Sequence, residues 1–196
     1  MMLNDTSSPL VLLRSRRSGK ARDMVAPGPD STQLADIIAI ATRVPDHGKL
    51  APWRIIEVPF AARERFAAML VAAYRTEKPS AGRLEIEAID AFPRQAPTML
   101  ALLSTPNTAS HIPLWEQQLS AGAMAMQLLN AAHAHGFVAN WLTGWPAASQ
   151  AVAATLGANA ADERIIGFIF IGTPATPLEE RPRPDIDSIA SVWDGN

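Results

Sequence analysis

The feature that most constrains this chain is a segment near its middle, residues 113–135, that is rich in alanine and apolar on more than one side. Its apolar residues recur at helical spacing, and Gly136 follows them, which is typical of a helix C-terminus. The pattern predicts the longest helix of the protein. A helix that is apolar on several sides must be covered by several elements, so we expect other parts of the molecule to pack around it.

The other apolar segments alternate between helical and strand patterns. Helices are predicted over residues 9–15, from a cap at Ser31 or Thr32 to a stop at Pro45, and over residues 61–77, 81–92 and 147–156. Strands are predicted over residues 53–58, 98–104, 137–142 and 165–171. Strands separated by helices favour an α+β or α/β sandwich around one sheet.

The last quarter of the chain is unusually rich in proline, with Pro174, Pro177, Pro182 and Pro184. Proline fixes φ and favours extended geometry in the residue before it. We therefore expect residues 174–187 to form an extended arm, and the whole chain of 196 residues to be one domain in which residues 174–196 are the C-terminal extension.

Composition and charge argue against several classes of function. The formal net charge of −2 disfavours a dedicated nucleic-acid binder, and no apolar run approaches the length of a membrane span. The chain contains no cysteine, and its first ten residues lack the pattern of a secretory signal, so a cytoplasmic location is expected. His133 and His135 lie roughly 200° apart around their predicted helix and cannot grip one metal from one face, so no metal site is predicted.

The common catalytic motifs are also missing. The sequence has no GxGxxG after a strand, no GxxxxGK[ST] and no GxSxG. These absences argue against a dinucleotide fold, a P-loop and a serine hydrolase. What remains is a set of dispersed residues suited to binding anions and planar rings.

Two of these candidates are pairs of arginines at opposite ends of the chain. Arg16 and Arg17 precede Ser18, and together they offer the bidentate and hydroxyl donors that a phosphate requires. Arg181 and Arg183 alternate with prolines on the predicted arm, which would hold them extended. Each pair alone also fits an ordinary solvated basic turn or a charged tail.

Two further candidates lie in predicted turns. Arg43 and His47 flank the rigid Pro45, although they also fit a surface turn that ends a helix. The run Trp141–Trp145 follows a predicted strand, where ligands commonly bind, and Gly144 would allow close backbone approach. The alternative is that both tryptophans fill the core.

Read together, the motifs resemble those of the FMN-dependent nitroreductase family, in particular its short, single-domain bacterial branch. The matching segments, in the family's order, are RRS (16–18), RVPDHGKLAPWR (43–54), WEQQLSAGAMAMQ (115–127), HGFVANWLTGW (135–145), GFIFIGTP (167–174) and RPRPD. RRS alone is a weak signal, whereas RxPDHxxxxPWR followed by WExxxSAGxAxQ is fairly specific. The resemblance covers nearly the whole chain.

The resemblance implies a role for each group of candidate residues. Arg16, Arg17 and Ser18 would hold the FMN phosphate and ribityl chain, completed by Arg183 and Arg181 from the arm. Arg43 and His47 would reach the flavin from the other subunit. The flavin ring or its polar edge would lie along Trp141, Leu142, Thr143 and Gly144. A segment assigned to NAD(P)H in close relatives corresponds to Ala131, Ala132, His133, Ala134, His135 and Gly136.

The resemblance also implies a fold and an activity. The fold would be the family's α+β sandwich, a mainly antiparallel sheet flanked by helices, in a homodimer whose interface includes residues 113–135 and whose flavin sites are shared. The activity would be ping-pong reduction of electron-poor acceptors, nitroaromatics or quinones, with hydride from NADH or NADPH passing through flavin N5. The flavin carries the chemistry, so no catalytic acid, base or nucleophile is expected.

Two departures from the family pattern leave alternatives open. Many members place an amide residue just before the Pro-Trp pair, where this chain has Ala51, and Leu142 replaces a polar or basic residue. Other hypotheses are a flavin-binding or flavin-storing dimer without turnover, another reduced-flavin chemistry on the same fold, and a structural dimer that binds no flavin.

Overall fold

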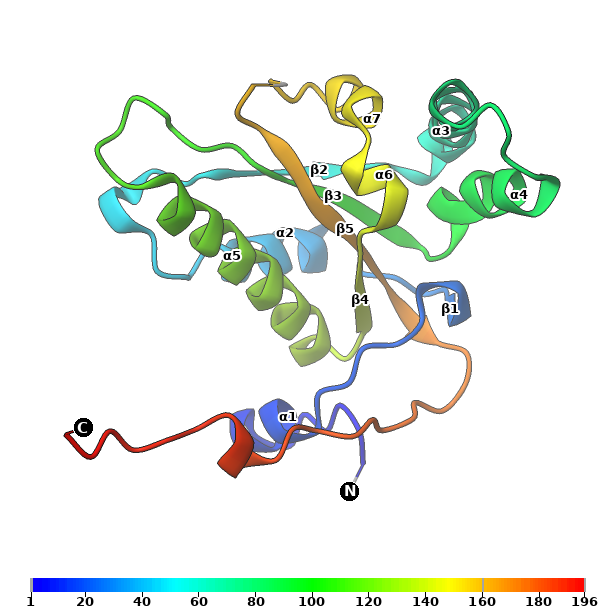
Figure 1. The fold of residues 1–196 in the computed structure, drawn as a ribbon. Coiled ribbons are helices and arrows are strands. Elements are labelled where there is room, and N and C mark those ends of the chain that lie inside the picture. Colours follow the sequence, from blue (N-terminus) through cyan, green and yellow to red (C-terminus); the bar gives the residue numbers. More distant parts are fainter. Residues whose placement is uncertain (1, 160, 196) are drawn as a thin grey trace.

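The computed structural model describes residues 2–159 and 161–195. Its helices are α1 Pro9–Ser15, α2 Ser31–Ala41, α3 Arg63–Glu77, α4 Arg83–Ala91, α5 Leu114–Ala134, α6 Gly144–Ala148 and α7 Gln150–Thr155. Its strands are β1 Met24–Val25, β2 Trp53–Glu57, β3 Thr98–Ser104, β4 Val138–Leu142 and β5 Arg164–Pro174. Figure 1 shows helices on both sides of the central strands.

The five strands form one antiparallel sheet organised around β5. The order is β1-β5-β3-β2, and β4 also pairs with β5. The α+β sandwich with a mainly antiparallel sheet is therefore confirmed. β5 pairs with β4 over Phe168–Gly172 and with β1 at its end. The chain segments on either side of β4 and of β1 therefore come together at one edge of the sheet.

Side chains alternate along β5 and supply two separate core layers. Phe168 and Phe170 pack with apolar residues of α3 and α4. Ile169 and Ile171 pack instead with residues of α2 and α5, on the opposite face. All four side chains are fully buried, and burial of each stabilises the fold by about 1.5–3 kcal/mol. The sheet is thus covered on both faces, and its β4 edge is the one that carries the candidate site.

Most predicted elements are confirmed, but one cap is wrong and two elements were not predicted. Asp30 caps α2 in place of Ser31 or Thr32, because its carboxylate accepts a hydrogen bond from the Gln33 amide while the Gln33 side chain accepts from Asp30 N. The sequence also gave no prediction of the two-residue strand β1 or of the five-residue helix α6.

The long helix α5 is covered by this chain on only part of its circumference. Its central residues are buried against α2 and the sheet. By contrast, exposed apolar side chains remain on α5 at Leu114, Trp115, Leu119 and Met126. The predicted helix is therefore confirmed, and one of its apolar faces is left open to solvent.

After β5 the chain runs along the surface past α1 (Figure 1), with one short helical turn at Ile186–Ser188. Residues 179–195 are exposed throughout. None of the helices within residues 2–159 and 161–195 has both the length and the hydropathy needed to cross a membrane.

Candidate functional site

The basic segment that follows α1 runs beside β4, and hydrogen bonds fix its backbone. The amide of Arg17 donates to the side chain of Asn4 at 2.7 Å, and the Asn4 amide donates back to the Arg17 carbonyl at 3.1 Å. The Asn140 side chain, on β4, donates to the carbonyl of Gly19. The backbone of the segment is therefore held in place, with Arg16 and Arg17 partly buried and Lys20 exposed.

His133, near the end of α5, contacts the backbone of the same segment through its imidazole ring. Its Nδ1 lies 2.5 Å from the Leu129 carbonyl and its Nε2 lies 3.2 Å from the carbonyl of Arg17. Burial, with a smaller contribution from the charge of Arg16, holds the pKa of His133 below its ordinary value. A neutral imidazole carries one N–H, so in that form His133 donates to only one of these two carbonyls.

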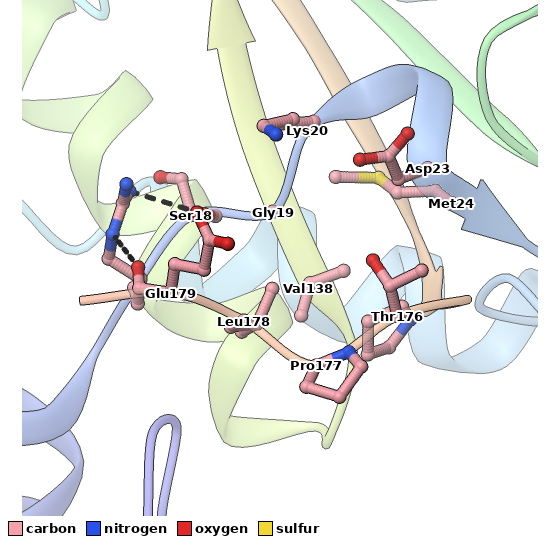
Figure 2. Close-up of a pocket in the computed structure, with 12 residues that line it drawn as sticks. Ser18, Gly19, Lys20, Asp23, Met24, Val138, Thr176, Pro177, Leu178 and Glu179 are labelled. Carbon is pink, nitrogen blue, oxygen red and sulfur yellow. Dashed lines mark hydrogen bonds between the residues drawn. The ribbon is translucent and has the colours of Figure 1, made fainter. Parts of the chain in front are cut away.

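The start of the C-terminal arm closes over the basic segment (Figure 2). The Arg17 Nε donates to the carbonyl of Glu179 at 2.8 Å, which joins two segments 162 residues apart. Between them lies a small hollow lined by Ser18 and Lys20 on one side and by Pro177 and Leu178 on the other. The arm is thereby held over the first of the predicted phosphate-binding motifs.

This arrangement gathers four arginines, Arg16 and Arg17 with Arg181 and Arg183. Burial lowers the pKa of Arg16, and repulsion from Arg183, Arg181 and Arg17 lowers it further. In the described part of the chain, the ion pair that we find for these four joins Arg183 to Glu180 at 2.8 Å. Two partly buried arginines, Arg16 and Arg17, grouped with the exposed Arg181 and Arg183 form a cluster of like charges that is suited to a multiply charged anion.

Arg43 and His47 lie at the opposite end of α5. The turn that carries them is tied to that helix, because Ser120 donates to the Pro45 carbonyl at 2.6 Å and His47 Nδ1 lies 2.9 Å from Glu116. Glu116 and His133 are 17 residues apart on one helix, or about 25 Å. A single chain therefore does not bring Arg43 and His47 to the arginine group.

Trp141 is partly buried against the core layer of α2 and α5, and its indole has a protein partner. Its Nε1 donates to the carbonyl of Ile166 at 3.0 Å. Its ring lies over Gly167, where an added Cβ would come within 2.0 Å of Nε1, so only glycine fits at that position. Packing thus accounts for part of this side chain, and its contact with a flavin stays a prediction.

The rest of the same run leads from the core to the surface. Leu142 packs against the core layer of α3 and α4, whereas Thr143 and Gly144 are exposed. Gly144 has φ +65°, a left-handed conformation that favours glycine, and starts α6 there. Thr143 and Gly144 also border an uncharged groove with Ile89 of α4. Thr143 and Gly144 are the most exposed part of this run, and Trp141 and Leu142 border the same groove.

The segment matched to NAD(P)H is mostly interior. Ala131, Ala132 and His133 are buried, whereas Ala134 and Gly136 are exposed. His135 lies between these and pairs with Asp36 at 2.9 Å. A nucleotide could contact this segment only at its last three residues.

Lys20 and Glu77 were not among the predicted site residues. Lys20 lines the hollow with Ser18, and its place two residues after that serine in a basic run was a usable signal. Glu77 accepts a hydrogen bond from Trp145 of α6, which lies 68 residues later in the chain, and no sequence pattern marks it.

Within residues 2–159 and 161–195, no three or more His, Asp or Glu side chains are grouped to hold a metal ion.

Comparison with known proteins decides the family. A profile described as the nitroreductase family matches residues 13–173. The chain belongs to the nitroreductase family. YdjA of Escherichia coli (strain K12), provisionally named an NAD(P)H nitroreductase, is 33% identical over 169 residues, with 84% of this chain and 87% of YdjA covered. The family predicted from the motifs is therefore confirmed.

Solved structures of this nitroreductase fold superpose over nearly the whole chain. A nitroreductase-like family protein from Bacillus cereus has a TM-score of 0.82 at 17% identity, covering 96% of this chain and 97% of its own. A variant of NfnB, an FMN- and NADPH-dependent nitroreductase from Sphingopyxis sp. strain HMH, has a TM-score of 0.74 at 22% identity, covering 96% and 100%. At these identities the likeness supports the fold.

Proposed function

We propose that this nitroreductase-family protein is an FMN-dependent oxidoreductase that takes hydride from NADH or NADPH and reduces electron-poor small molecules, such as nitroaromatics or quinones. The observation that carries the proposal is the group of four arginines, in which the charges of Arg183, Arg181 and Arg17 act on the partly buried Arg16. The relatives' names add support, since they cite NAD(P)H, or FMN with NADPH.

The donor set fits a flavin mononucleotide. Its phosphate would be held by Arg16 and Arg17, by the Ser18 hydroxyl, and by Arg181 and Arg183 from the arm. A dianionic phosphate would relieve the repulsion that lowers the pKa of Arg16.

The ring would extend from this group along β4, past Lys20 and toward the exposed turn at Thr143–Gly144. FMN, when bound, supplies the chemistry by accepting hydride and passing electrons to the acceptor. The residues of this chain bind and orient it. Lys20, which lines the hollow, would place a positive charge beside the ring and favour negative charge there. The acceptor would occupy the same place as the nicotinamide.

A second copy of the chain would complete the site. The turn that carries Arg43 and His47 contacts the first half of α5, where Glu116 lies about 25 Å from His133, so these two residues would contribute to the partner's flavin. The apolar side chains of Trp115, Leu119 and Met126 on α5 remain exposed in one chain, and a second copy would cover them. We therefore propose a homodimer with two shared flavin sites.

The activity is tested by an absorbance spectrum of purified protein incubated with FMN, followed by anaerobic addition of NADPH or NADH. We expect bound flavin whose absorbance is lost promptly on adding the donor. Bound flavin that neither donor reduces would contradict the reductase and favour storage. A protein that takes up no FMN would contradict flavin binding itself.

The shared site is tested by mixing two inactive variants. Chains carrying Arg16→Ala with Arg17→Ala are exchanged with chains carrying Arg43→Ala, and NADPH-dependent reduction is measured. A mixed dimer would contain one site built entirely from unmutated residues, so activity should return. If each variant alone is inactive and mixing restores nothing, the two groups do not build one site across subunits.

A further inference from the structure

The carboxylate of Glu77, the last residue of α3, connects two short helices that follow β4. Its Oε2 accepts a hydrogen bond from Trp145 Nε1 at 2.7 Å, and its Oε1 accepts one from the Ser149 hydroxyl at 2.6 Å. Trp145 is the second residue of α6 and Ser149 is the residue after it. Glu77 therefore binds α6 at both of its ends.

Helix α6 depends on such contacts because it is weak on its own. It has five residues, and Thr143 provides no side-chain cap. Isolated helices of this length are not stable in water. Packing adds to this support: Pro146 is buried, Trp145 and Ala147 pack against the core, and the ring of Tyr74, also on α3, meets the Trp145 indole edge to face with 4.7 Å between the ring centroids. The end of α3 therefore holds α6 through one ring and one carboxylate.

Ser149 extends the effect of Glu77 to α7. Its hydroxyl is the N-cap of that helix and accepts a hydrogen bond from Val152 N at 3.3 Å. A hydroxyl has one proton to donate, and here it is directed to Glu77, which leaves the oxygen lone pairs facing the Val152 amide. Ser149 is 3% exposed, so this arrangement is sheltered from water.

We propose that Glu77 is a positioning residue for flavin chemistry, which fixes α6 so that the exposed turn at Thr143–Gly144 keeps its place against the flavin ring. The inference rests on the proposed function, in which that turn borders FMN. Gly144 is the first residue of α6, so any rotation of the helix moves the turn directly. Glu77 makes no contact with the arginine group, so it acts on the ring end of the site and leaves phosphate binding unchanged.

The test compares Glu77→Ala and Glu77→Gln with the matched control Glu64→Ala. Glu64 is another carboxylate of α3, and it accepts two hydrogen bonds from Arg94, both at 2.6 Å, without touching α6. Two readouts are measured: the midpoint potential of bound FMN, and amide hydrogen exchange over residues 144–149 in the FMN-free protein. Steady-state kinetics and FMN affinity accompany them.

For Glu77→Ala we expect a shifted midpoint potential, faster exchange over residues 144–149 and about tenfold lower kcat, because both hydrogen bonds that Glu77 accepts from Trp145 and Ser149 are lost. FMN affinity should change less than about threefold. Glu77→Gln retains one acceptor oxygen and should recover part of each change, whereas Glu64→Ala should match the wild-type protein.

Three results would overturn the inference. The first is FMN binding with an unaltered potential in Glu77→Ala, which contradicts the inference alone. The second is an equal effect of Glu64→Ala, which would show a general loss of α3 rather than positioning. The third is failure of the wild-type protein to bind FMN, which overturns the proposed function as well.

Discussion

Arg63 and Arg16 are buried fully and partly, respectively, and their guanidinium groups have different surroundings. Arg63, at the start of α3, is 2% exposed, and its guanidinium is surrounded by backbone carbonyls. It donates to Val58 at 2.6 Å, Pro93 at 2.5 Å, Ala96 at 3.1 Å and Pro97 at 3.2 Å. Four of its five N–H donors are thus bonded to backbone carbonyls within the fold.

Arg16 is partly buried as well, but its neighbours are cations. It donates to the Ser18 hydroxyl at 3.3 Å, and burial followed by repulsion from three other arginines lowers its pKa. The pKa of Arg63 is lowered by burial too, but Glu57 counteracts this in part. A buried cation bonded to several backbone carbonyls is structural, whereas one held among like charges indicates an anion-binding site.

The largest effect should come from removing two cations of the arginine group. Arg16→Ala with Arg17→Ala is expected to weaken FMN binding by two or more orders of magnitude, because two charge-assisted contacts of ~1.5–3 kcal/mol each are lost. Titration followed by flavin fluorescence measures this. The FMN-free variant should be as stable as the wild-type protein, since mutual repulsion is removed. Unchanged flavin retention would contradict the phosphate assignment.

Arg63→Met should lower the stability of the protein and leave its FMN affinity unchanged, the reverse of the result expected for the variant without Arg16 and Arg17. Four carbonyls lose their donor, so the free energy of unfolding should fall by about 3 kcal/mol, while the folded fraction binds FMN normally. Urea unfolding of the FMN-free protein provides the measurement. Arg63 would not be structural if its loss left stability intact and reduced FMN affinity instead.

A smaller effect is expected from the arm. Arg181→Ala with Arg183→Ala should weaken FMN binding about tenfold, because both side chains are exposed and one already pairs with Glu180. The same titration applies. If this pair mattered more than Arg16 and Arg17, the main phosphate contacts would lie on the arm.

The smallest effect concerns pH. Burial lowers the pKa of His133 in the folded protein, so between that value and the unfolded value of 6.5 the unfolded chain binds more protons. Stability from this residue is therefore complete above about pH 6.5 and is lost as the pH falls toward the folded pKa. Urea unfolding between pH 5 and 8 should show this slope, and His133→Gln should flatten it. An unchanged slope in the variant would assign it to other groups.

Much of the fold could be predicted because its patterns are local. Residues 98–104 form a fully buried run and are the strand β3, and α5 begins and ends within one residue of the predicted helix. Elements whose stability comes from distant residues were missed. The two residues of β1 pair with the end of β5, and α6 depends on Glu77 and Tyr74.

The site could be predicted only in parts. Arg17 and Glu179 are joined across 162 residues, and no local pattern shows that the arm returns to the basic turn; the family resemblance suggested it. Spacing also could not show that Arg43 and His47 lie at the far end of α5. The role of the Trp141 side chain depended on the close approach of Gly167, which belongs to another strand.

The central claim is that the four arginines bind the phosphate of FMN, and the most direct measurement compares FMN with riboflavin, which lacks that phosphate. The wild-type protein should bind FMN at least 100-fold more tightly than riboflavin, as expected for two charge-assisted contacts. Arg16→Ala with Arg17→Ala should lose most of this preference and bind riboflavin as the wild-type protein does. Equal affinity of the wild-type protein for both flavins would contradict the account.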